Sequence, residues 1–119
     1  MPRILLVEDD RDVRVLVEHV LIREGYHVDP AVTLAAARTL LADREYQLVL
    51  ADAALPDGTG FPIADEAERR GIPVIIMTAY AFRYAKEALA RFEILLKPVR
   101  PAEILEAVGN ALRSSQSAC

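Results

Sequence analysis

The sequence lacks several features on which whole classes of protein depend. One of its 119 residues is cysteine, Cys119 at the very end, so no internal disulfide can form and a cytoplasmic location is expected. No apolar run is long enough to span a membrane, and the N-terminus does not have the plan of a signal peptide. The net charge of -4 and the lack of a Lys/Arg run argue against a nucleic-acid-binding surface.

What the sequence does have is an apolar share of 53%, which is enough to build one core. There is no internal repeat and no low-complexity tract. We therefore expect residues 1–119 to form one domain, with an ordered core at about residues 2–113 and a ragged tail at 114–119. The start at Met1 and the Ser-rich end fit either a stand-alone protein or a piece cut at a linker.

Short apolar runs alternate along the chain with segments in which apolar residues recur every three or four positions. The first pattern predicts strands and the second predicts helices. The expected strands lie at residues 3–7, 27–31 and 47–51, within 72–78, and at 94–96. The expected helices cover residues 13–21, 34–41, 62–70 and 82–91 and begin again at Pro101, with Thr33 as an N-cap and Gly25 as a stop.

This alternation predicts an α/β fold, a doubly wound parallel sheet of five strands. Strands that alternate with helices pair in parallel through right-handed crossovers, and a sheet of this size commonly has the order 2-1-3-4-5. The first, third and fourth strands are almost entirely apolar, as expected where helices cover both faces. In such sheets ligands bind at the carboxyl ends of the strands, so the chemistry is expected there.

The residues that follow the strands form a consistent set. They are Glu8, Asp9 and Asp10, then Asp52, then Thr78, and finally Lys97 followed by Pro98. Clustered acids repel one another unless a cation neutralises them, and a hard cation such as Mg²⁺ prefers oxygen ligands. An ionised Asp52 held beside Mg²⁺ is a nucleophile for a phosphoryl group, with Lys97 and Thr78 available to contact the phosphate oxygens.

Each of these residues also has a structural explanation. Acids at the start of a helix interact favourably with its dipole, and an aspartate or a Lys-Pro pair after a strand commonly belongs to a turn. The joint placement of the residues at strand ends that should meet favours a phosphoryl-transfer site over the separate structural explanations.

Four separated motifs resemble the receiver domain of bacterial two-component response regulators. They are ILLVEDD at residues 4–10, DAALPDGTG at 52–60, MTA at 77–79 and KP at 97–98. The resemblance covers the whole chain, and its motifs occur in the family's order. It implies a flavodoxin-like fold and a signalling switch that catalyses only its own phosphorylation and dephosphorylation, not a turnover enzyme.

The resemblance also implies residue roles. Asp52 is then the phosphoacceptor, and Glu8, Asp9, Asp52 and the backbone carbonyl of Ala54 hold Mg²⁺. Thr78 is the switch hydroxyl, and Lys97 is the family's lysine, usually followed by a cis peptide bond to proline. The expected phosphoryl donor is a phosphohistidine on a histidine kinase or phosphotransfer domain, and a downstream protein of unknown identity reads the switch. We expect a monomer or weak dimer without membrane or nucleic-acid partners.

The sequence departs from the family pattern at its switch region. Ile94 stands where the family usually has Tyr or Phe, so rotation of an aromatic ring there cannot be the readout; Phe92, Tyr80 or Tyr84 are candidate substitutes. The segments on either side of Thr78 are short, which predicts short or displaced third and fourth helices. Ala54 and Tyr80 occupy positions that tune the lifetime of the phosphate, one small and one able to shield the site.

Of three other functions, the residues favour one and argue against two. A degenerate receiver would bind partners without phosphorylation, which Ile94 and the short segments favour. An aspartyl-nucleophile phosphatase usually needs a second acid two residues after its nucleophile, where this chain has Ala54. A flavin-binding module would need a phosphate-cradling Ser/Thr/Gly loop after the first strand, where this chain is acidic.

Overall fold

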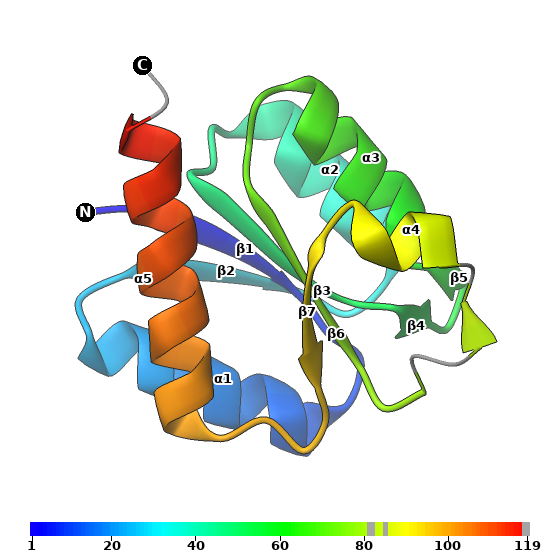
Figure 1. Cartoon of the computed structure of the whole chain (residues 1–119), viewed down its shortest axis with the longest axis horizontal. Coiled ribbons are helices and arrows are strands. Elements are labelled where there is room, and N and C mark those ends of the chain that lie inside the picture. The colour runs from blue at the N-terminus through cyan, green and yellow to red at the C-terminus, as the bar shows by residue number, and fades with distance from the viewer. Residues whose placement is uncertain (81–82, 85, 118–119) are drawn as a thin grey trace.

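A five-stranded parallel sheet runs through the centre of the computed structural model, which describes residues 1–117 apart from residues 81, 82 and 85 (Figure 1). Its strands are β1 (Arg3–Val7), β2 (His27–Ala31), β3 (Leu48–Asp52), β6 (Val74–Thr78) and β7 (Glu93–Leu96). Their order across the sheet is β2-β1-β3-β6-β7, and every neighbouring pair is parallel. This confirms the predicted order 2-1-3-4-5 for the five main strands.

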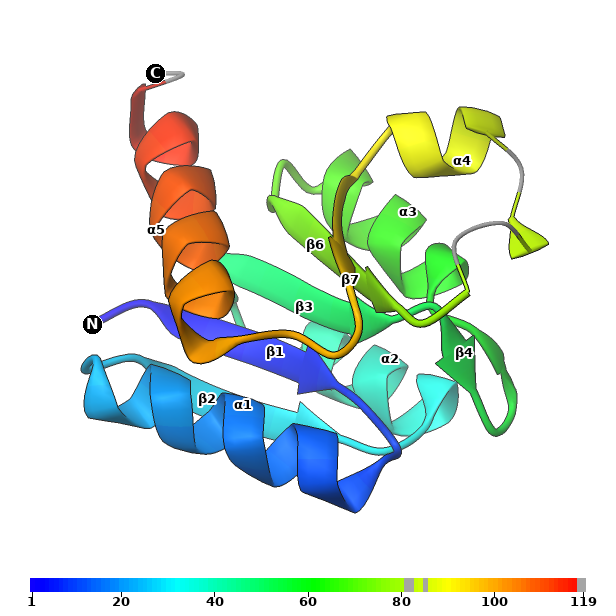
Figure 2. The same ribbon diagram turned by 60° about the horizontal axis from the view of Figure 1, so that its bottom comes forward.

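Helices cover both faces of the sheet (Figure 2). On one face lie α1 (Arg11–Arg23) and α5 (Pro101–Ser117), and on the other lie α2 (Leu34–Asp43) and α3 (Phe61–Arg69). The short α4 (Lys86–Ala90) lies beside β7 at one edge of the sheet. The doubly wound architecture expected from the sequence is therefore present.

The core divides into two apolar layers because successive strand residues point to opposite faces. Leu5, Val49 and Ile76 pack with the apolar sides of α2 and α3. Their neighbours Ile4 and Leu50 pack instead with α1 and α5. The central strands are buried on both faces, which explains their nearly continuous apolar sequence.

The edge strand β2 differs in composition from the central strands. It contains Pro30, which has no backbone N–H to donate to a neighbouring strand. Because β2 pairs only with β1, this missing donor costs no hydrogen bond to a second neighbour. The mixed composition of β2 thus follows from its place at the sheet edge.

The helix ends largely follow the expected signals. Asp10 caps α1 by accepting a hydrogen bond of 3.1 Å from the backbone N–H of Val13, and Thr33 caps α2 by accepting one of 3.0 Å from Ala36. Gly25 follows α1 with a φ of 97°, a left-handed conformation that favours glycine.

Three features differ from the prediction. A small antiparallel hairpin of β4 (Ala54–Leu55) and β5 (Gly58–Thr59), which was not expected from the sequence, is present, because Pro56 and Asp57 supply a two-residue turn. The fourth helix was expected over residues 82–91, but its described part is only α4, and residue 82 lies outside the described residues. Helix α5 extends to Ser117, into the segment expected to be a tail, since no Gly or Pro interrupts residues 114–117; the extent of the ordered core stays a prediction.

The two helices that the sequence predicted to be short are short. Helix α3 has nine residues and α4 has five. Within the described part of the chain, no helix combines the length and apolar character needed to cross a membrane.

Candidate functional site

The carboxyl edge of the sheet gathers the polar residues that the sequence places after the strands. Glu8 follows β1, Asp52 ends β3 and Thr78 ends β6. These three are the buried polar or charged residues among those whose burial the structure describes, with exposed fractions of 0%, 6% and 2%. Burying polar groups is costly unless they are compensated, so their concentration at one edge marks this region as the candidate site.

Lys97 provides the positive charge at this edge. Its Nζ lies 2.6 Å from Asp52 Oδ2 and 2.6 Å from Glu8 Oε1. Burial lowers the pKa of Lys97, but the hydrogen bonds and charges of Asp52 and Glu8 outweigh this effect and raise the pKa above its ordinary value. Lys97 is therefore held as a cation between two carboxylates. The peptide bond from Lys97 to Pro98 is cis, as expected from the sequence.

The carboxylates outnumber the cation. Oxygens of Glu8, Asp9 and Asp52 lie within 4.8 Å of one another, and Asp9 is the exposed member of the three. Burial, together with the neighbouring Asp52, raises the pKa of Glu8 to about 7, and the contact with Lys97 offsets only part of this rise. When all four groups are ionised, two negative charges at the site have no partner.

The arrangement fits a divalent cation. Glu8 Oε1 is buried and, apart from its ion pair with Lys97, has no hydrogen bond from any residue that the structure describes. Two unbalanced negative charges on oxygen ligands match the charge and ligand preference of Mg²⁺, which retains several waters when few carboxylates bind it. Glu8, Asp9 and Asp52 are the side chains that could hold it. Ala54 lies at the exposed start of β4, and its N–H donates to Asp52 Oδ1 at 3.1 Å.

The loop after Asp52 is held close to it. The N–H of Gly60 donates to the carbonyl of Ala53, and a Cβ at position 60 would lie 2.2 Å from the carbonyl oxygen of Asp52. Only glycine fits that approach. Asp57, in the turn of the hairpin, accepts hydrogen bonds from the backbone N–H groups of Leu34 at 2.8 Å and Ala35 at 3.1 Å. The hairpin is thereby attached to the N-terminus of α2.

The residues predicted to switch or tune the site occupy different environments. The hydroxyl of Thr78 accepts a hydrogen bond of 3.0 Å from the N–H of Tyr80. The Tyr80 side chain is 48% exposed, and the guanidinium of Arg83 lies 4.2 Å from its ring centroid. Ile94 is half-buried and packs against the apolar layer under α2 and α3. The tuning of the phosphate lifetime by Ala54 and Tyr80 stays a prediction.

The aromatic residues near α4 form a cluster of their own. The ring centroid of Phe61, at the start of α3, lies 5.2 Å from that of Tyr84 and 6.2 Å from that of Phe92. Two of the three candidate substitutes for the family's switch aromatic, Tyr84 and Phe92, therefore contact the element that directly follows the loop of Asp52. The third, Tyr80, faces Arg83 instead.

Sequence reasoning did not identify two residues that contact the loops of the site, Asp57 as a cap and Arg14. Arg14 Nη1 donates to the carbonyl oxygens of Glu8 at 3.2 Å and Asp9 at 3.3 Å. Arg14 lies only five and six residues after the two carbonyl groups, but no sequence pattern marks these contacts. No local signal connects Asp57 with α2, because the bonded residues lie 23 and 22 positions apart.

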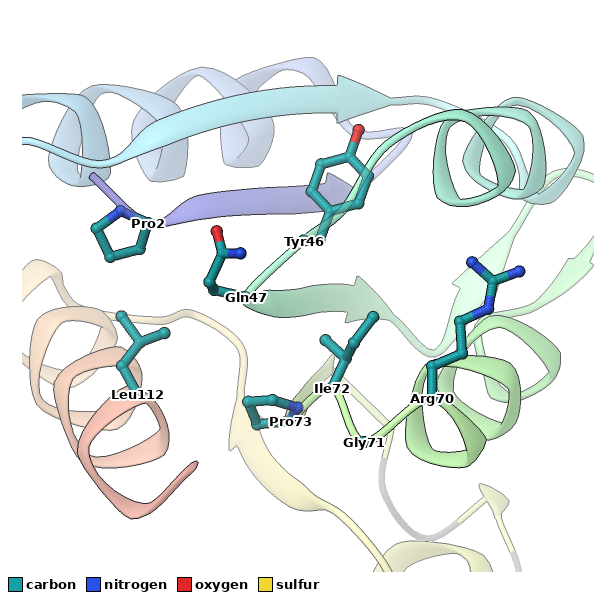
Figure 3. A pocket seen from close by; sticks show the side chains of 8 residues that line it. All are labelled: Pro2, Tyr46, Gln47, Arg70, Gly71, Ile72, Pro73 and Leu112. Carbon is teal, nitrogen blue, oxygen red and sulfur yellow. The ribbon is translucent and has the colours of Figure 1, made fainter. Parts of the chain in front are cut away.

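A hollow of about 260 Å³ lies at the amino end of the sheet, opposite the candidate site (Figure 3). It is lined by residues that precede the strands, among them Pro2, Gln47 and Pro73. The guanidinium of Arg70 at its rim is already bound to the carbonyl of Leu41 at 2.7 Å and to Glu66 at 3.0 Å. This hollow contains none of the acids of the candidate site, and its charged group has protein partners.

Comparison with known proteins identifies the family and agrees with the fold. Residues 4–109 match the response regulator receiver domain, and the chain belongs to this family. It is 37% identical over 114 residues to the response regulator protein PilR of Pseudomonas aeruginosa, covering 92% of this chain and 26% of that protein. It is 34% identical to the transcriptional regulatory protein GltR of the same species, covering 95% of this chain and 50% of that protein. The chain thus spans between about a quarter and a half of these relatives.

Solved structures give the same result. A CheY-like receiver domain protein from Methanospirillum hungatei superposes with a TM-score of 0.89 at 28% identity, covering 100% of this chain and 99% of that one. The response regulator TrrA of Thermotoga maritima, solved in complex with Mg²⁺-BeF, gives a TM-score of 0.84 at 29% identity over 94% of this chain and 100% of that one.

Proposed function

We propose that this receiver domain is a phosphorylation-dependent signalling switch that accepts a phosphoryl group on Asp52 in the presence of Mg²⁺. The observation that carries the proposal is the buried arrangement of Glu8, Asp52 and Lys97, in which Lys97 Nζ lies 2.6 Å from both carboxylates. Structural ion pairs balance their charges, whereas this cluster keeps an excess of negative charge where a cation and a phosphoryl group would bind.

The chemistry requires a carboxylate nucleophile. An oxygen of Asp52 forms a bond to phosphorus while the bond from phosphorus to the donor nitrogen breaks, giving an aspartyl phosphate and a free histidine on the donor. Asp52 Oδ1 is oriented by the N–H of Ala54 at 3.1 Å and Oδ2 by Lys97. These contacts hold the nucleophile in one orientation before the donor arrives.

A bound Mg²⁺ would neutralise the charge of the incoming phosphoryl oxygens, a task for which phosphoryl-transfer sites commonly use this ion. Glu8, Asp9, Asp52 and the carbonyl of Ala54 are the ligands we propose. The related regulator TrrA was solved with Mg²⁺-BeF, which supports the assignment by analogy.

Lys97 and Thr78 are assigned to the phosphorylated state. Once a phosphoryl group is attached to Asp52, the ammonium of Lys97 is near enough to pair with a phosphate oxygen without moving far from its present position. The Thr78 hydroxyl, which now accepts from the Tyr80 N–H, is free to donate its own hydrogen. Its donation to the phosphate would shift the chain that follows β6 and bias two arrangements of that segment.

The proposed donor is the phosphohistidine of a histidine kinase or phosphotransfer domain in the cytoplasm, and a downstream protein reads the shifted segment. The chain then acts as a signalling component whose only catalysis is its own phosphorylation and dephosphorylation.

The test is to incubate the protein with Mg²⁺ and a small acyl phosphate and to measure its intact mass. We expect a phosphoryl adduct on the wild-type chain that requires Mg²⁺ and is absent from Asp52→Asn. Asp29→Asn is the matched control, because it removes a carboxylate from β2 and leaves the site unchanged. A folded wild-type chain that forms no adduct with donor in excess would contradict the proposal.

One observation favours a second candidate, a receiver that binds partners without phosphorylation. Ile94 is a half-buried aliphatic residue packed against the core and cannot swing an aromatic ring between buried and exposed positions as the family's residue does. This candidate predicts that Mg²⁺ and a phosphodonor leave the conformation unchanged even if Asp52 is modified. Amide chemical shifts of residues 78–80 and 93–97, measured before and after phosphorylation, distinguish the two.

A further inference from the structure

Arg14 lies on α1 outside the cluster of carboxylates but contacts the loop that carries two of them. Its Nη1 donates to the carbonyl oxygen of Glu8 at 3.2 Å and to that of Asp9 at 3.3 Å. Both peptide groups are therefore anchored to one guanidinium, which is half-buried and charged at every physiological pH.

The contact matters because the two acids differ in how their side chains are held. Glu8 is completely buried, and its Oε2 accepts a hydrogen bond of 3.1 Å from the N–H of Asp10. Asp9 is exposed, and its side chain forms no hydrogen bond or ion pair with any residue that the structure describes. The backbone of Asp9 sets the direction of its Cα–Cβ bond, and the backbone carbonyl of Asp9 is bound by Arg14.

We infer that Arg14 is a positioning residue for the divalent cation: by holding the carbonyl groups of Glu8 and Asp9, it fixes the direction in which their carboxylates meet the ion. This inference rests on the proposed function, in which these acids bind Mg²⁺. Groups that orient metal ligands without touching the metal typically contribute tenfold or more to affinity. Arg14 acts here through the backbone of the ligands, whereas Lys97 acts through direct contact with their side chains.

The helix also supplies a matched control. Arg11 is an exposed arginine three residues earlier on α1. Its side chain forms no hydrogen bond or ion pair within the described part of the chain. Arg11→Gln and Arg14→Gln change the net charge equally and near the same loop. Only the second removes the donor to the two carbonyl groups.

The experiment is a titration of the wild-type chain and both variants with MgCl₂, followed by ¹⁵N amide chemical shifts, with thermal unfolding in EDTA as the test of folding. We expect Arg14→Gln to raise the Kd for Mg²⁺ about tenfold and Arg11→Gln to change it less than about twofold. Phosphorylation of Arg14→Gln by an acyl phosphate should be slow at low Mg²⁺ and return to the wild-type rate at saturating Mg²⁺. A role in folding alone would not produce this dependence.

The outcomes separate the inference from the proposed function. If the wild-type chain shows no Mg²⁺-dependent shifts, both are wrong. If the wild type binds and Arg14→Gln binds equally well, or if both variants lose affinity equally, only the positioning role is wrong. Should Arg14→Gln fail to fold, Arg14→Lys provides the same comparison with a smaller expected loss of about threefold, because a lysine keeps the charge but loses the planar fork.

Discussion

Two clusters of charged residues in this chain differ in the ratio of carboxylates to cationic side chains. The edge cluster, centred on Asp29 of strand β2, consists of Asp29, Arg3, Arg44 and the hydroxyl of Tyr46. One oxygen, Asp29 Oδ2, accepts from both arginines at 3.1 Å and from Tyr46 at 2.8 Å. Burial raises the pKa of Asp29, but these donors outweigh it and hold the pKa below its ordinary value. The negative charge of the Asp29 carboxylate therefore has two cationic partners and a hydroxyl donor.

The site cluster, at the carboxyl edge, consists of Glu8, Asp9, Asp52 and Lys97. Here three carboxylates share one cation, and burial raises the pKa of Glu8 to about 7. The comparison distinguishes a structural use of charge from a functional one. The edge cluster is complete as folded, whereas the site cluster becomes balanced only when a cation binds.

Removal of a positively charged side chain should have the largest effect on the free energy of unfolding and should distinguish the clusters most clearly. Lys97→Met leaves the buried carboxylates of Glu8 and Asp52 without a counter-charge, and we expect a loss of about 3 kcal/mol in the free energy of unfolding. Arg44→Met leaves Asp29 with Arg3 and Tyr46 and removes a half-exposed partner, so its loss should be below about 1 kcal/mol. Urea unfolding in EDTA measures both, and equal losses would refute the distinction.

Addition of a divalent cation should have the next largest effect on stability. A ligand that binds only the folded state at a hundred times its Kd stabilises it by about 2.7 kcal/mol. We expect this gain with Mg²⁺ for the wild type and for Asp29→Asn. Asp9→Asn should lose most of the gain, and its stability in EDTA should hardly change because Asp9 is exposed. Thermal unfolding with and without Mg²⁺ provides the data; a full gain in Asp9→Asn would remove Asp9 from the ligand set.

The sequence identified the site cluster but not the edge cluster, and the reason is geometric. Glu8, Asp52 and Lys97 each lie at the carboxyl end of a strand, and parallel strands bring these ends together at one edge of the sheet. Tyr46 and Asp29 lie 17 positions apart on a connection and an edge strand, so their contact depends on the packed structure. The contacts of Asp57 with α2 escaped prediction for the same reason, since the bonded residues lie 23 and 22 positions apart.

Neutralising one carboxylate in each cluster should give effects of opposite sign. Asp29→Asn leaves two arginines and a tyrosine hydroxyl facing an uncharged amide, and we expect a loss of about 1 to 2 kcal/mol. Asp52→Asn removes one of the unbalanced charges and leaves the pair of Lys97 with Glu8, so the metal-free chain should gain about 1 kcal/mol. Chemical denaturation in EDTA at neutral pH tests both signs, and a destabilised Asp52→Asn would show that the site cluster is already balanced.

A change of pH should have the smallest effect, because it removes no side chain. The pKa of Glu8 rises from 4.5 to about 7 on folding, so between these values the folded chain binds more protons than the unfolded chain. Stability of the metal-free protein should therefore fall as pH rises from about 5 to 7. The lowered pKa of Asp29 acts in the other direction and in another window, since its contribution is lost only as pH falls below about 4.

Glu8→Gln is the variant that isolates the first of these two slopes. It removes the titrating group, so the decline in stability between pH 5 and 7 should largely disappear, while the acid-side loss attributed to Asp29 should persist. Unfolding followed at half-unit pH steps in EDTA would measure both limbs. If Glu8→Gln kept the wild-type decline, a group other than Glu8 would have to take up the proton between pH 5 and 7. The raised pKa of Glu8 would then no longer distinguish the two clusters.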